Sequence, residues 1–228
     1  KSHIFDETTV TMRTAFFLLI CSAFLFGSCK TSPGSEVNDN STVDGHPAWI
    51  MQGNIYEVNV RQYTPEGTFA AFEKHLDRLK EMGVQTLWFM PINPISVKDR
   101  KGALGSYYAI ADYKAVNPEF GTLEEWKSLV KNAHDKGFKV IIDWVPNHTG
   151  ADHPWLASNP DFYLKNAQGI PTHPLETDWT DIRKLEYKGA HMAQLTDSMI
   201  AAMKYWITET DIDGFRIDVA GEVGKEFY

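Results

Sequence analysis

The sequence has 228 residues, 43% of them hydrophobic and 23% charged, and its formal net charge at pH 7 is −8. These fractions are ordinary for a folded globular protein and exclude a disordered or collagen-like chain. The acidic balance also excludes a basic nucleic-acid-binding surface, because DNA and RNA backbones are themselves negative.

The start of the chain is typical of an exported protein. Arg13 precedes an apolar run from Ala15 to Phe26, and two small residues follow it. This order predicts a secretory signal peptide, so residues 1–28 are assigned to upstream residues and the signal, with Met12 as a candidate start. The run is too short to be a comfortable transmembrane helix.

Cys29 directly follows the predicted signal. The segment Leu25 to Cys29 resembles the end of a bacterial lipoprotein signal. The resemblance implies that Cys29 is lipidated, and that the protein crosses the inner membrane and is held in the cell envelope or at the cell surface by that lipid. An ordinary signal peptide with an incidental cysteine is the alternative. Residues 29–48 are otherwise polar and without periodicity, which predicts a flexible tether.

Strand and helix patterns alternate after the tether. Apolar runs predict strands, and helical spacing between capping residues and glycines predicts helices. The predicted strands cover residues 55–61, 84–90, 138–145 and 214–220, and the predicted helices lie at 68–83, 122–137 and about 192–206. Buried strands separated by helices predict a parallel α/β sheet, either doubly wound or a barrel. A glycine-rich phosphate loop does not follow the first strand, which argues against a dinucleotide fold.

Charged residues stand at the ends of two of these strands. Asp143 lies near the end of the third strand, and Arg216 and Asp218 share one face of the fourth. Both α/β architectures place their sites at the carboxyl ends of strands. We expect Arg216 and Asp143 to pair and to leave Asp218 ionised and free, as suits a nucleophile or transition-state stabiliser in glycoside hydrolysis. A buried ion pair that merely closes the sheet is the structural alternative.

Four ordered motifs then carry a resemblance to a known family. Residues 143–148, 214–219, 86–94 and 106–122 resemble the signature segments of the α-amylase family of glycoside hydrolases. The resemblance implies a catalytic (β/α)8 TIM barrel that acts on α-glucans with retention of configuration.

The resemblance also assigns roles to residues at the matching positions. It implies that Asp218 is the nucleophile, that Arg216 orients it and that Asp143 supports Arg216. His148 is expected to hydrogen-bond the sugar at the cleavage position, and Tyr108 to stack on it. Taken alone, His148 would be an ordinary loop histidine; for Tyr108 the alternative is a core tyrosine.

A structural calcium ion is the one cofactor that the resemblance raises, at Asn147. Two departures leave calcium binding open: Glu222 occupies a position where calcium-binding relatives often have a histidine, and the loop from Gln62 to Gly67 lacks an Asp-rich calcium sequence. No organic cofactor is expected.

The predicted organisation is a barrel of which about the first four β/α units are present. Residues 49–147 hold strands one to three, residues 148–187 a short inserted domain B, and residues 188–228 the third helix and fourth strand. The general-acid glutamate is expected beyond Tyr228, so this stretch alone is expected to be inactive. The expected function is hydrolysis of α-1,4-glucosidic bonds. A related α-glucosidase, debranching enzyme or glucan transferase, or a non-catalytic glycan-binding lipoprotein, remains an alternative.

Overall fold

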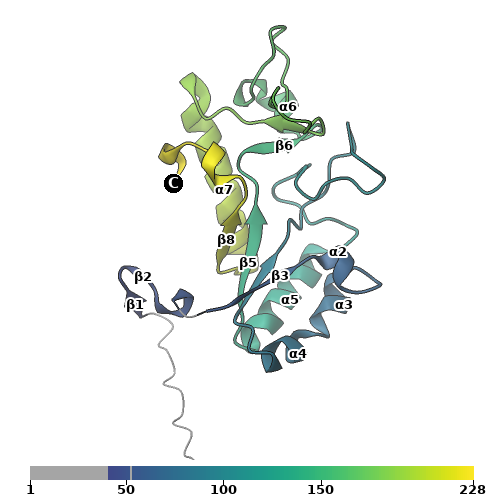
Figure 1. Cartoon of the computed structure of the whole chain (residues 1–228), viewed down its shortest axis with the longest axis vertical. Coiled ribbons are helices and arrows are strands. Elements are labelled where there is room, and N and C mark those ends of the chain that lie inside the picture. The colour runs from purple at the N-terminus through teal and green to yellow at the C-terminus, as the bar shows by residue number, and fades with distance from the viewer. Residues whose placement is uncertain (1–40, 52) are drawn as a thin grey trace, which may run out of the picture. The chain divides into compact units, whose positions relative to one another are not determined.

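The computed structural model describes residues 41–51 and 53–228 (Figure 1). The predicted signal peptide and the lipid site at Cys29 lie outside the described residues. Within the described ranges, no helix combines the length and apolar character needed to cross a membrane. The chain divides into two units, residues 1–52 and 53–228, which are described separately.

The described part of the first unit is a small hairpin at the end of the predicted tether. Strands β1 (Thr42–Val43) and β2 (His46–Pro47) pair in antiparallel fashion, and the 3-10 helix η1 (Ala48–Ile50) follows. The two residues that join the strands, Asp44 and Gly45, both have positive φ angles, 51° and 81°. Two positive φ angles in a two-residue connection suit the turn that a twisted hairpin requires.

The second unit is built on a four-stranded parallel sheet. Its strands are β3 (Ile55–Val58), β4 (Thr86–Phe89), β5 (Lys139–Trp144) and β8 (Gly214–Ile217), and they lie side by side in the order β3-β4-β5-β8. The spatial order follows the chain order without the reversal that defines a doubly wound sheet. The described strands are therefore arranged as successive strands of a barrel.

Helices connect these strands, and their ends are set by local chemistry. They are α3 (Phe69–Glu73), α4 (Leu76–Glu81), α5 (Leu123–Asp135) and α7 (Met192–Thr210). Helix α5 begins with a capping box: the Glu125 amide donates to Thr122 Oγ1 at 3.2 Å, and the Thr122 amide donates to Glu125 Oε2 at 2.7 Å. Gly83 and Gly137 follow α4 and α5 with φ angles of 81° and 77°, which favour glycine and end each helix.

Two predicted elements differ in extent. The first strand ends at Val58 because Asn59 caps a short helix, α2 (Val60–Tyr63), its Oδ1 accepting from the Gln62 amide at 3.3 Å. The helix predicted for residues 68–83 is interrupted and forms α3 and α4. The cap at Asn59 starts a helix within the segment that was predicted as strand.

The fourth strand also ends earlier than predicted, at Ile217, and the 3-10 helix η4 (Ala220–Glu222) follows. Val219 adopts a left-handed conformation with φ 51° and ψ 38°, which turns the chain out of the strand. Asp218 therefore lies just past the strand, at the edge of the sheet. Its amide still donates to the Trp144 carbonyl on β5 at 2.8 Å.

Aromatic side chains fill the core between the sheet and the helices. The Phe89 ring on β4 meets the Phe72 ring at 5.2 Å and the Trp126 ring at 4.9 Å between centroids, both edge to face. On α7, the buried Trp206 donates its indole N–H to the Tyr113 carbonyl at 2.7 Å. Edge-to-face contacts and a satisfied indole N–H are the favourable ways to bury such large side chains. This core holds the strand ends in fixed positions.

The segment predicted as domain B contains a small sheet of its own. Strands β6 (His148–Gly150) and β7 (Ile182–Lys184) pair in antiparallel fashion, with helices α6 (Trp155–Ser158) and η2 (Pro160–Phe162) between them. Figure 1 shows this segment above the carboxyl end of β5. Two further 3-10 helices, η3 (Gly189–His191) and η5 (Lys225–Phe227), precede α7 and end the chain. The domain boundaries themselves stay a prediction.

Candidate active site

An ionic cluster of three residues lies where β5 and β8 end. The strands pair so that Asp143 is directly opposite Arg216. Arg216 Nη1 donates to both carboxylate oxygens of Asp143 at 3.1 Å and to Asp218 Oδ1 at 2.8 Å. The predicted pairing of Arg216 with Asp143 is present. The expectation that Asp218 would be free of that pair is wrong, because one guanidinium nitrogen reaches both carboxylates.

Burial sets the electrostatics of Asp143. Its side chain is fully buried, and this loss of solvation raises the pKa of Asp143 to about 6 although Arg216 opposes the shift. The Tyr108 hydroxyl donates to Asp143 Oδ2 at 3.3 Å. Burial, followed by the negative charge of Asp143, raises the pKa of Tyr108 well above its usual value, so that this hydroxyl remains a proton donor.

Arg216 is held from its other side by an aromatic ring. Its Cζ atom lies 4.8 Å from the centroid of the Trp88 ring on β4, within the range of a cation–π contact. Burial alone would lower the pKa of Arg216, but the hydrogen bond and charge of Asp143 outweigh it and the pKa is raised. Arg216 is therefore a permanent cation on β8 that also contacts residues of β5 and β4.

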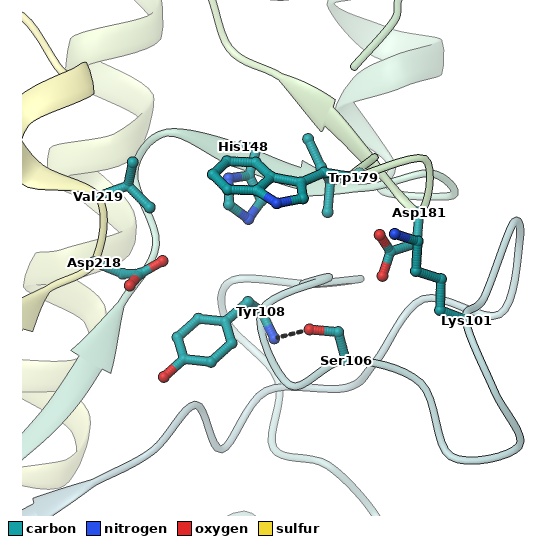
Figure 2. Close-up of a pocket in the computed structure, with 9 residues that line it drawn as sticks. Lys101, Ser106, Tyr108, His148, Trp179, Asp181, Asp218 and Val219 are labelled. Atoms are coloured by element: carbon teal, nitrogen blue, oxygen red, sulfur yellow. Dashed lines mark hydrogen bonds between the residues drawn. The ribbon is translucent and has the colours of Figure 1, made fainter. Parts of the chain in front are cut away.

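A cavity of about 340 Å³ opens beside this cluster. Figure 2 shows Trp179 and His148 on one side of it and Tyr108 and Ser106 on the other, with Asp218 at one end. Three of the predicted site residues, Asp218, His148 and Tyr108, thus line a single cavity. The remaining lining residues are Lys101, Asp181, Ile182 and Val219. Asp143 and Arg216 are not in the cavity lining. Asp143 contacts Tyr108, and Arg216 contacts Asp218.

His148 enters this cavity as a neutral ring. Burial lowers the pKa of His148 to about 4. The side-chain nitrogen Nδ2 of Asn147 lies 3.2 Å from His148 Nδ1 and donates to it. The proton of the neutral ring is therefore on Nε2. At neutral pH His148 is therefore an uncharged ring at the cavity, and a hydrogen bond with the Tyr108 backbone opposes the lowering of its pKa.

Asn147, the predicted calcium ligand, contacts the His148 ring and is buried. Ca²⁺ takes six to eight oxygen ligands. Among the described residues, no group of three or more His, Cys, Asp or Glu side chains is placed to hold a metal ion. Ca²⁺ is also bound by amide and backbone oxygens, so calcium at Asn147 stays a prediction of the sequence.

Strain marks the position after Asp218. Val219 is β-branched, and such residues rarely adopt a positive φ angle; here the angle is 51°. Conformations of this kind cost about 1–3 kcal/mol and gather at functional sites. Sequence analysis missed Val219, because a valine after a strand carries no turn signal.

Sequence analysis also missed Trp179, Lys101, Ser106 and Asp181. Trp179 and Asp181 belong to the inserted segment, and Lys101 and Ser106 to the loop after β4. The one available signal was the richness of the inserted segment in tryptophan and aspartate. Which of those side chains faces the cavity depends on the path of the loops, so that signal identified the segment and not the residue.

The buried histidines predict how stability changes with pH. Burial lowers the pKa of His153, as it does that of His148, to about 4. Between about pH 6.5 and pH 4 the unfolded chain binds protons that the folded chain does not, so each histidine lowers stability as the pH falls. Asp143, whose pKa is raised to about 6, acts in the opposite sense, and its contribution to stability is lost as the pH rises through that value.

His153→Gln tests the contribution of a buried histidine to the pH dependence of stability. His153 is not part of the cavity lining, so the substitution leaves the site residues in place. Urea unfolding at pH 7.5 and pH 5 is expected to show that the wild-type protein loses on the order of 2 kcal/mol more than the variant over this interval. Equal losses in wild type and His153→Gln would contradict the prediction.

Comparisons with known proteins agree with this geometry. The family model described as "Alpha amylase, catalytic domain" matches residues 35–184. The solved structure of an alpha-amylase from Lactobacillus plantarum is 42% identical, with a TM-score of 0.72 over 77% of this chain and 40% of that one. The parallel sheet is accordingly part of a (β/α)8 barrel, as the sequence predicted.

Two curated relatives have names that denote different functions. Trehalose synthase of Pimelobacter sp. (strain R48) is 32% identical over 80% of this chain and 36% of its own length. The amino acid transporter heavy chain SLC3A1 of Mus musculus is 31% identical over 59% of this chain and 21% of its own length. The chain thus spans well under half of the length of each of these two relatives.

Proposed function

Because the chain belongs to the alpha-amylase family of glycoside hydrolases and transferases, we propose that the complete protein hydrolyses α-1,4-glucosidic bonds in starch and maltooligosaccharides with retention of configuration. The observation that carries the proposal is the joint placement of Asp218, His148 and Tyr108 around one cavity, with Arg216 holding the carboxylate. A structural ion pair has no need of a cavity next to it.

The geometry supports Asp218 as the nucleophile. Arg216 Nη1 holds Asp218 Oδ1, and we assign attack on the anomeric carbon to Oδ2. The attack forms a glycosyl ester and breaks the bond to the leaving oxygen, which takes a proton from a second carboxyl group; water then cleaves the ester. That second carboxyl group must lie about 5–5.5 Å from the nucleophile, and we assign it to no residue of this chain.

The other residues have positioning roles in this proposal. Arg216 orients Asp218 through its hydrogen bond to Oδ1, and the buried Asp143 fixes the guanidinium through two hydrogen bonds. His148, neutral at the pH of the reaction, donates to a sugar hydroxyl. Tyr108, tied to Asp143 through its hydroxyl, presents its ring to the sugar. The roles of Asp143, His148 and Tyr108 are to hold substrate and nucleophile in line.

The proposal is tested with the complete protein and maltoheptaose, followed by proton NMR. New reducing ends are expected to appear first as the α-anomer, because two displacements restore the starting configuration. First release of the β-anomer would contradict retention. Products longer than the substrate would identify a transferase, and a single-glucose product an α-glucosidase. An intact maltoheptaose together with cleavage of the α-1,6 branches of amylopectin would identify a debranching enzyme. Binding without turnover would identify a glycan-binding protein.

We further propose that the protein is exported and anchored through lipidated Cys29. The support is the order of charged, apolar and small residues before Cys29 and the polar segment after it. Expression with radiolabelled palmitate is expected to label the wild-type protein and not Cys29→Ser. Equal labelling of both would contradict the lipid site.

A further inference from the structure

The turn that follows Asp218 has a strained backbone. Val219 has φ 51° and ψ 38°, a left-handed conformation that a β-branched residue rarely adopts. Figure 2 shows Val219 beside Asp218 at one end of the cavity. A strained conformation persists only where the surrounding structure over-determines it. The position of Asp218 therefore depends on contacts that hold the turn from outside.

Hydrogen bonds and burial hold the main chain of this turn on the barrel side. The Asp218 amide donates to the Trp144 carbonyl at 2.8 Å, and the Glu222 amide donates to the Val219 carbonyl at 3.0 Å. Val223, the next residue, is buried in the core. Glu222 itself is exposed, so its side chain is free to make a contact away from the barrel.

That contact is an ion pair with the inserted segment. Lys184 Nζ on β7 donates to Glu222 Oε2 on η4 at 3.2 Å. The Lys184 side chain is 23% exposed and that of Glu222 is 59% exposed. An ion pair of such exposure contributes little to stability. Its effect is therefore sought in the geometry of the two segments that it joins.

Lys184 is a fixed anchor for this ion pair. It lies directly opposite His148 in the antiparallel pairing of β6 with β7. Its amide donates to the Thr172 carbonyl at 3.0 Å, and its carbonyl accepts from the Leu164 amide at 2.9 Å. The ion pair thus connects the turn after Asp218 to the strands that place His148 at the cavity.

We infer that Glu222 and Lys184 are positioning residues for the nucleophile. Their ion pair holds the strained turn at Val219, and through it Asp218, in register with the inserted segment. Neither residue lines the cavity at Asp218, so both act through the turn and not on the substrate. This inference rests on the proposed function and adds to it a contact that aligns the nucleophile with the sugar.

Lys184→Met and Glu222→Gln in the complete protein test the inference. With maltoheptaose, each is expected to lower kcat about tenfold and to leave KM within about twofold of wild type, because a small displacement of a reacting group slows the reaction without weakening binding. The melting temperature is expected to change by less than about 3 °C, since an exposed ion pair is lost. Lys188→Met is the matched control: Lys188 is exposed on the same segment, and wild-type kcat is expected.

Two further variants show whether the residues act as a pair. Lys184→Met/Glu222→Gln is expected to be no slower than either single variant, because the same interaction is lost only once. Lys184→Arg keeps the cation and is expected to stay within about threefold of the wild-type kcat. Effects that multiply in the double variant would overturn the pair as the cause.

Other outcomes overturn the inference in recognisable ways. Single variants with wild-type kcat would refute it and leave the hydrolase intact. A kcat lowered by about 10³ or more in Glu222→Gln alone, with Lys184→Met near wild type, would make Glu222 a reacting group. A melting temperature lower by more than about 10 °C would show a general structural role. Failure of the wild-type protein to cleave maltoheptaose would overturn both the proposed function and this inference.

Discussion

Asp218→Asn is expected to lower kcat of the complete protein on starch by a factor on the order of 10⁴ or more, as for other nucleophile deletions. The amide has almost the shape of the carboxylate but cannot form the glycosyl ester. Its oxygen can still accept from Arg216 Nη1, the donor that holds Asp218 Oδ1 at 2.8 Å, so the fold is expected to remain intact. Reducing-sugar release measures the first effect and thermal unfolding the second.

Asp197→Asn provides the matched control for this variant. Asp197 is exposed on α7 and is not part of the cavity lining, and the same change of charge there is expected to leave kcat unaltered. Activity of Asp218→Asn within about tenfold of wild type would refute Asp218 as the nucleophile, because the asparagine side chain cannot form the glycosyl ester.

Arg216→Met is expected to have the second large effect, on both stability and activity. It leaves the fully buried Asp143 side chain without its cation, and removal of one partner of a buried ion pair costs about 3–5 kcal/mol. We expect about 3 kcal/mol, the lower end of that range, because the Arg216 side chain is itself 37% exposed. Urea unfolding measures the loss, and kcat is expected to fall because Asp218 loses its orienting donor.

A second substitution separates the two effects of Arg216. Asp143→Asn removes the buried charge, so the double variant Asp143→Asn/Arg216→Met is expected to regain most of the lost stability and none of the activity. The deficit of Arg216→Met is also expected to shrink at lower pH. Without the cation the pKa of Asp143 rises further, and the stability lost above that pKa returns as the carboxyl group is protonated. Recovery of activity in the double variant would show that Arg216 acts only on stability.

Some site geometry follows from sequence because parallel strands constrain it. Once β5 and β8 are recognised as neighbouring buried strands, their carboxyl ends lie at the same edge of the sheet, and Asp143 and Arg216 are directed to each other. The residue pattern alone left Asp218 free, and the contact of Arg216 with Asp218 was implied only by the family resemblance. It depends on the turn at Val219, where the chain adopts a conformation that its local sequence does not favour.

The sequence by itself determined the periodic elements: the capped and glycine-ended helices, the parallel strands, and the acidic and basic residues at their ends. These follow from hydrogen bonding and burial over a few neighbouring residues, which the local pattern records. Only the tertiary structure decided which loop residues meet. Trp179 and Tyr108 lie 71 positions apart and face one cavity because the inserted segment and the loop after β4 are joined by ion pairs. Contacts between long loops depend on where the sheet and helices hold their ends, and a local pattern does not contain that information.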